Sequence, residues 1–135
     1  MYAHRSEFSQ HEAALSSLRD LAEGAAAWAL PVFVIGEFLR VVTHPRILHP
    51  PTAETEAVDA IDGLLESRSI RVLSPGERYW ALLREAVVEA GARGNLLVDA
   101  EIVAVCLENG ATSILTEDRD FRRFSGISVR RLPAA

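Results

Sequence analysis

The chain contains no lysine, so its 14 lysine-or-arginine cations are all arginines. Without a lysine amine, a P-loop phosphate site and a Schiff-base enzyme are excluded. The only cysteine, Cys106, lies in an apolar run, so no internal disulfide can form and a buried thiol is favoured over a catalytic one. No apolar stretch approaches the ~18 residues of a membrane span, and no secretory signal is visible. We therefore expect a cytoplasmic protein with no membrane partner.

Acidic side chains outnumber basic ones. Over 135 residues, 19 carboxylates against 14 arginines give a net charge of −5, and the length suits a single domain over residues 1–135. This charge excludes a generic polybasic nucleic-acid binder. It does not exclude a metal-dependent nuclease, because carboxylates that hold a cation also count as negative charge. None of the four histidines pairs with the cysteine at the spacing of a zinc site.

Short apolar segments alternate with longer amphipathic ones, which predicts an α/β fold with a mainly parallel sheet. Capping boxes, a proline at a first helical position and glycines after helix ends mark the boundaries. Such sheets gather binding residues beyond the carboxyl ends of their strands. The expected helices cover residues 9–23, 31–44, 52–65, 74–90 and 98–109, and the expected strands cover residues 27–30, 70–73, 112–115 and 127–132.

Five side chains carry local predictions about these elements. Ser9 and Ser74 each open an S-x-x-E capping box, and Thr52 is placed to cap a third helix. Trp80 is expected to face inward with its helix's other large apolar residues. Asp99 is expected in the first turn of its helix.

Four carboxylates, Glu37, Asp99, Asp118 and Asp120, stand out by their surroundings. Glu37 interrupts an apolar helix, and an acid there needs either a solvent-facing position or a partner. Asp99 has an alternative role in complementing the helix dipole, and Asp118 and Asp120 have one as turn and capping residues. As a functional group, the four match a site for a hard cation such as Mg²⁺, which prefers oxygen ligands and promotes phosphodiester hydrolysis.

Three segments resemble the PIN-domain ribonuclease toxins of the VapC family, which belong to type II toxin–antitoxin systems. The string GNLLVDAEIVAVCLENGATSILTEDRDFRRF, residues 94–124, resembles the C-terminal half of that family. EFLRVVTHPRI, residues 37–47, resembles its second-helix motif, and YAHR, residues 2–5, resembles the segment directly after its first strand. The similarity runs in order over essentially the whole chain.

The resemblance implies a three-layer α/β/α fold and an endoribonuclease that depends on Mg²⁺ or Mn²⁺. It implies a cognate antitoxin as protein partner, RNA as substrate and a homodimer. By position, Glu37, Asp99 and Asp118 resemble the family's metal-binding acids, and Asp120 resembles an accessory catalytic acid of the same turn. Two arginines are candidates for contacts with the substrate phosphate, and these are Arg40 and Arg119.

The chain departs from the family pattern at its start. Family members carry a hydrophobic strand ending in D-x-N-x-L-L before the segment that resembles Tyr2–Arg5, whereas this sequence begins at Met1. That strand lies at the centre of the family's sheet, and its aspartate is a principal metal ligand. Either the start is assigned too late or shortened, or the protein is naturally truncated. Relative to the family, residues 1–135 are then an N-terminally truncated domain.

Two other functions compete with the nuclease. The first is a catalytically impaired, truncated toxin that only binds its antitoxin. The second is a generic α/β domain whose four acids are surface features. Removing the acids would leave RNA cleavage unchanged in the second case, whereas restoring an upstream strand with its aspartate would recover cleavage only if the chain derives from an enzyme.

We predict that the polypeptide 1–135 is poorly stable or pairs its open strand edges with another chain. Loss of a central strand leaves unpaired backbone groups on two neighbouring strands and exposes an apolar layer. Thermal unfolding of the purified chain checks this, with its oligomeric state measured in parallel. A monomer that unfolds cooperatively above ~55 °C, within the ordinary range of mesophile domains, would contradict the prediction.

Overall fold

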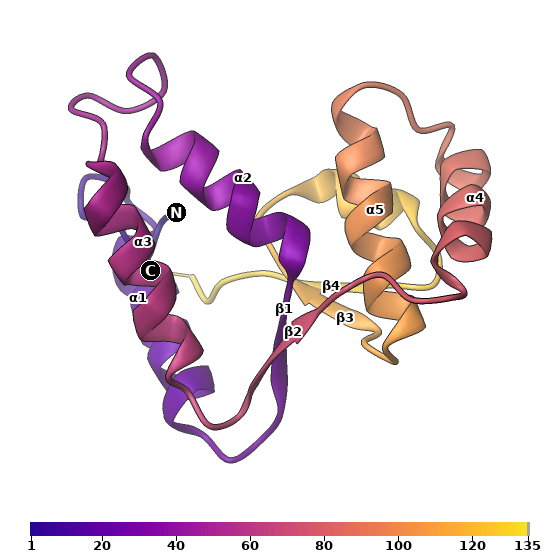
Figure 1. The fold of residues 1–135 in the computed structure, drawn as a ribbon, viewed down its shortest axis with the longest axis horizontal. Helices are drawn as coiled ribbons and strands as arrows, with labels where there is room; N and C mark the ends of the chain where they lie inside the picture. The colour runs from indigo at the N-terminus through magenta and orange to yellow at the C-terminus, as the bar shows by residue number, and fades with distance from the viewer. Residues whose placement is uncertain (135) are drawn as a thin grey trace. The chain divides into compact units, whose positions relative to one another are not determined.

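The computed structural model describes residues 1–134, and these form two compact units (Figure 1). The first unit holds Met1–Val72 with residues 133–134, and the second holds Leu73–Leu132. No helix in the described part of the chain is both long and apolar enough to cross a bilayer.

The first unit contains three helices and two short strands. Strand β1 runs directly into helix α2 at Pro31, whose fixed φ suits a helix start (Figure 1). Helices α2 and α3 pack together around a small core of Val42, Leu48 and Ala57. The bounds are α1 His11–Glu23, β1 Trp28–Pro31, α2 Val32–Val42, α3 Glu54–Leu65 and β2 Ile70–Leu73.

The second unit is built around one buried helix. Helix α5 is apolar over most of its circumference, and its residues 102–106 are all less than 10% exposed, which is the pattern of a helix covered on several sides. Helix α4 packs on α5, and the 3-10 helix η1 also contacts it. The bounds are α4 Tyr79–Ala90, α5 Asn95–Glu108, β3 Ser113–Leu115, η1 Arg119–Arg123 and β4 Ser128–Arg130.

Strands β3 and β4 pair in parallel, with Ile114 opposite Val129. A parallel pair needs a crossover of about a dozen residues, and residues 116–127 form it. The backbone N–H of Thr116 donates to the Arg130 carbonyl at 2.9 Å, which extends the pairing to the point where the crossover begins. The acidic turn predicted from the sequence begins at Thr116, directly after the carboxyl end of β3.

The described strands form two separate two-stranded sheets, β1 with β2 and β3 with β4, instead of the single sheet expected from the sequence. The resemblance placed a further strand at the centre of that sheet. None of residues 1–27 forms a strand. The parallel α/β character is confirmed, and the elements follow the predicted order, with most boundaries within three residues of those expected.

The side-chain caps predicted for α1, α3 and α4 are wrong. Helix α1 follows Gln10, with Ser9 bonded to the Gln10 side chain, and no side chain caps it. At α4, the carboxylate of Glu108 takes the place of Ser74 by accepting from the backbone N–H groups of Gly76 and Arg78 at 2.7 and 2.8 Å. A Cβ on Gly76 would lie 2.7 Å from this carboxylate, so glycine permits the contact.

The side chains of Trp80 and Thr52 lie elsewhere than predicted. Trp80 is 68% exposed, because Ala86 supplies the buried contact of α4 in its place. Thr52 does not cap α3. Its buried hydroxyl accepts from the guanidinium of Arg5 at 3.1 Å and bonds the ring of His4 at 3.1 Å. Thr52 thus fastens the N-terminal segment to the loop before α3.

We predict that Thr52→Val lowers the free energy of unfolding by about 1 kcal/mol, because two side chains of the N-terminal segment lose their shared partner. Urea unfolding measures the change. Thr55→Val, at an exposed position of α3, is the matched control and should change the stability by less than about 0.5 kcal/mol. Equal effects of the two substitutions would show that the Thr52 hydroxyl does not anchor the segment.

Candidate metal centre

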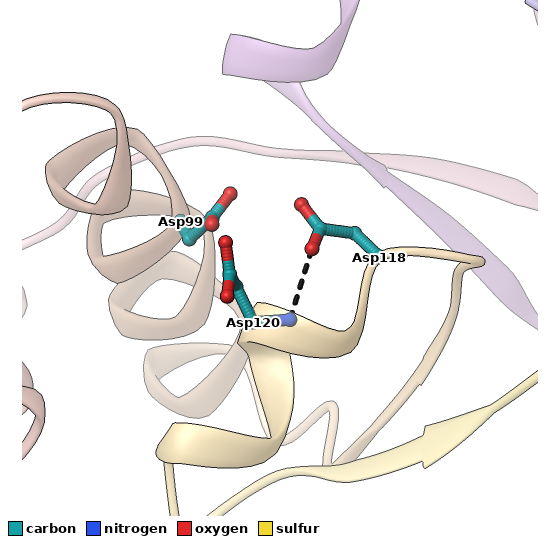
Figure 2. A group of neighbouring side chains, drawn as sticks. All are labelled: Asp99, Asp118 and Asp120. Carbon is teal, nitrogen blue, oxygen red and sulfur yellow. Dashed lines mark hydrogen bonds between the residues drawn. The ribbon is translucent and has the colours of Figure 1, made fainter.

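Three of the four predicted acids meet in the second unit. Asp99 projects from α5, whereas Asp118 and Asp120 belong to the crossover between β3 and β4 (Figure 2). One carboxylate oxygen from each lies within 4.8 Å of those of the other two. Residues far apart in the sequence are thus brought together by the packing of η1 on α5.

The turn that carries Asp118 is fixed by local hydrogen bonds. The Asp118 backbone N–H donates to the hydroxyl of Thr116 at 3.0 Å, and the Asp118 carboxylate accepts from the Asp120 backbone N–H at 2.9 Å. Asp118 therefore caps η1, as its alternative role predicted. The capping bond uses one carboxylate oxygen, and Figure 2 shows the second oxygen free of that bond and facing the space beside Asp99.

Asp99 occupies a different position on its helix than expected. Helix α5 begins at Asn95, so Asp99 lies in the second turn and no acid occupies the first. The helix-dipole role proposed for Asp99 falls away, since that effect is confined to the first turn. The start predicted from the sequence, residue 98, is three residues too late. Gly94, with φ of +56°, ends the preceding turn, and Asn95 already belongs to the helix.

The environment of Asp99 disfavours its charged form. Partial burial raises the pKa of Asp99 to about 6, and the negative charges of Asp118 and Asp120 contribute to the rise. Burial penalises an ionised carboxylate, and like charges add to the penalty. A cation between the three side chains would offset both penalties, because it would supply the opposite charge that the site lacks.

Glu37, the fourth predicted acid, belongs to the first unit, in helix α2. Its carboxylate forms an ion pair with Arg40 one helical turn away, and both side chains are about half exposed. This hydrogen bond with Arg40 holds the pKa of Glu37 below its usual value. The pair supplies the partner that an acid within an apolar helix needs. The metal-binding role of Glu37 and the phosphate-binding role of Arg40 stay predictions.

Two other ionisable groups of this unit have structural roles. Glu117 accepts from the guanidinium of Arg131 at 2.6 Å and from the backbone N–H of Leu132 at 2.8 Å, so it ties the turn to the chain beyond β4. Cys106 is buried on α5, and burial raises the pKa of its thiol to about 11. A thiol that stays protonated at neutral pH is a poor nucleophile, in agreement with the structural role expected for Cys106.

The arrangement of α5, the β3–β4 crossover and the carboxylate cluster is that of a PIN domain, whose family profile matches residues 2–127. Among curated proteins, the ribonuclease VapC43 of Mycobacterium tuberculosis is 39% identical over 130 residues, which cover 96% of this chain and 88% of the relative. Ribonuclease VapC25 of the same organism is 30% identical over 131 residues, or 97% of this chain and 92% of the relative. The chain belongs to the VapC family of PIN-domain proteins.

A solved structure supports the same fold. The crystal structure of VapBC2 from Rickettsia felis, bound to a DNA fragment from its promoter, contains a chain that matches with a TM-score of 0.65. The match covers 98% of this chain and 92% of the other, at 17% sequence identity. At that identity the likeness concerns the fold alone, and the fold agrees with the family membership.

We predict that Asp99→Asn stabilises the metal-free protein at pH 7.5. Because the pKa of Asp99 is raised to about 6, ionisation of this carboxyl opposes folding above that pH. The gain is on the order of 1 kcal/mol, less than the full shift implies, since water partly screens the site. At pH ~4 the carboxyl is protonated in the folded state and about half protonated in the unfolded state, so most of the gain should vanish.

Thermal unfolding in EDTA at pH 7.5 and pH 4 measures the difference. Glu85→Gln, at an exposed position of α4, is the control and should leave the pH dependence unaltered. A variant Asp99→Asn that unfolds at a lower temperature than the wild type at pH 7.5 would contradict the electrostatic description of the site.

Proposed function

We propose that the chain is a metal-dependent endoribonuclease whose divalent cation, Mg²⁺ or Mn²⁺, is held by Asp99, Asp118 and Asp120. The observation that carries the proposal is the convergence of three carboxylate oxygens within 4.8 Å. The names of the relatives, which are ribonucleases, support RNA as the substrate class.

The donor set fits the proposed cation. Carboxylate oxygens are the hard ligands that Mg²⁺ and Mn²⁺ prefer, and Mg²⁺ is commonly held by one or two of them together with waters. The raised pKa of Asp99 reflects burial and a repulsion that a cation would relieve. When bound, the divalent ion supplies positive charge opposite the phosphodiester and makes an attacking water more acidic.

Each residue then has a distinct task. Asp99, on the rigid helix α5, is the proposed direct ligand. Asp118 presents the oxygen that its capping bond leaves free, so the hydrogen bond from the Asp120 N–H orients it. Asp120 faces the other two carboxylates and completes their arrangement (Figure 2). Glu37 is the proposed fourth acid, and its carboxylate is paired with Arg40 in the first unit.

In the cell, we infer that the protein acts as the toxin of a toxin–antitoxin pair, with a cognate antitoxin as its partner. The solved VapBC2 complex, in which the related chain has the fold of this one, supports a partner of that kind. A homodimer is the proposed oligomeric state. The alternative, a protein that binds the antitoxin without cleaving RNA, requires no contribution from the three-aspartate site.

We predict that Asp99→Asn lowers Mg²⁺-dependent RNA cleavage by about 100-fold or more, as expected when a group that stabilises charge at the reacting centre is lost. The measurement is single-turnover cleavage of a labelled RNA, with EDTA as the metal-free reference. The matched control is Glu101→Gln on the same helix, which should retain cleavage because residues two apart on a helix do not share a face.

Two outcomes would count against a metal-dependent nuclease. Cleavage by the wild type that persists in EDTA would show that no divalent cation is needed. Absence of cleavage, together with a stable complex with the antitoxin, would favour the binding-only alternative. Equal losses in Asp99→Asn and Glu101→Gln would point to a general disturbance of α5.

A further inference from the structure

The side chains of the short helix η1 lie along three edges of the helix. In a 3-10 helix, residues three apart lie on the same edge, so Arg119 and Arg122 share one edge and Asp120 and Arg123 share the next. The third edge holds Phe121, which is only 6% exposed. Phe124, directly after the helix, is 1% exposed and continues the buried side. These two phenylalanines fix the roll of the helix, and the Arg119–Arg122 edge is therefore held on the surface.

These two arginines have no counter-charge in the described part of the chain. Both are exposed, and neither guanidinium group makes a hydrogen bond or ion pair with any of residues 1–134. Two other arginines of the same unit are engaged: Arg78 donates to the Glu108 carbonyl at 3.1 Å, and Arg131 pairs with Glu117 at 2.6 Å.

The nearest acids in sequence do not neutralise the pair. Asp118 and Asp120 flank Arg119 directly, yet their carboxylates gather with that of Asp99 (Figure 2). The fold thus separates two charges of each kind within five consecutive residues. In a protein with a net charge of −5, two unpaired guanidinium groups next to a carboxylate site indicate an anionic ligand.

We propose that Arg119 and Arg122 form a two-residue clamp for the backbone phosphates of the RNA strand next to the bond that is cleaved. The inference rests on the proposed nuclease function and adds Arg122 and a defined geometry to it. Three residues of 3-10 helix advance about 6 Å, so the two side chains can reach successive phosphates of one strand. Guanidinium groups suit this role because they contact phosphate with two parallel hydrogen bonds.

The clamp would also offset the electrostatic repulsion between the acidic site and RNA. Three clustered carboxylates repel an approaching phosphodiester, and an overall acidic protein cannot attract RNA by its net charge. Cations placed within one helical turn of the acids act locally, at distances where salt screens them least. The strand would thereby be held next to the reacting phosphate without either arginine entering the carboxylate cluster.

The test is the salt dependence of RNA binding. Fluorescence anisotropy of a short, labelled, mixed-sequence single-stranded RNA is followed over a salt series in EDTA, where metal-dependent cleavage is absent. Each phosphate contact contributes about 0.7 to the slope of log Kd against log salt. The double variant Arg119→Gln/Arg122→Gln should therefore lose about 1.4 from that slope, and its KM for cleavage should rise more than its kcat falls.

Two controls make the result specific. Arg119→Lys/Arg122→Lys keeps the charges and should restore most of the slope, whereas Arg84→Gln, at an exposed position of α4, should leave the slope unchanged. Thermal unfolding of every variant shows which of them fold. If the glutamine double variant does not fold, the lysine double variant is compared with the wild type in its place.

The outcomes separate the clamp from the nuclease function. An unaltered slope in the folded glutamine variant overturns the clamp, as would wild type that does not bind RNA, and the arginines would then face another anion such as an acidic peptide. RNA binding with the predicted slopes but no cleavage in Mg²⁺ would retain the clamp and refute the nuclease. Cleavage by the glutamine variant with an unchanged KM would retain the nuclease and refute the clamp.

Discussion

The three carboxylates that the fold holds within 4.8 Å of one another repel each other, and the rest of the site depends on that repulsion. Helix α5 is buried on several sides, so packing fixes the position of the Asp99 backbone. The Asp118 carboxylate is held near Asp99 as well, because it caps η1 by accepting from the Asp120 backbone N–H. Burial raises the pKa of Asp99 to about 6, and the repulsion from Asp118 and Asp120 adds to the rise. An arrangement that opposes its own ionisation is typical of sites that gain their stability from a ligand.

The same local structure separates opposite charges. The three-residue period of η1 directs Asp120 towards the carboxylates and Arg119 with Arg122 along another edge, while Phe121 anchors the helix in the core. Acids for a cation and arginines for a phosphate can then lie within five residues without neutralising one another. The net charge of −5 is thus compatible with a protein that acts on RNA.

Much of this could be predicted from the sequence. Alternating segments indicate the order of helices and strands, and the turn after a short apolar strand locates Asp118 and Asp120. The cap of α4 was not predictable, because the group that anchors this helix is Glu108, which lies 30 residues away in sequence. Burial of Ala86 in place of Trp80 depends on how α4 packs, and periodicity alone does not define that face.

The start of α5 was missed because Gly94 and Asn95 are typical loop residues. Glu37 differs again: its helix is predictable, but its ion pair with Arg40 depends on rotamers that a sequence does not specify.

The central claim is that the three aspartates bind one divalent cation in place of a proton on Asp99. Titration calorimetry with Mn²⁺ at pH 6, in two buffers with different heats of ionisation, measures both the binding and the protons released. We expect saturable binding with the release of a fraction of one proton, and the loss of both in Asp99→Asn, because the pKa of Asp99 is about 6 in the free protein. Binding that is unchanged in Asp99→Asn, or no saturable binding to the wild type, would contradict the account.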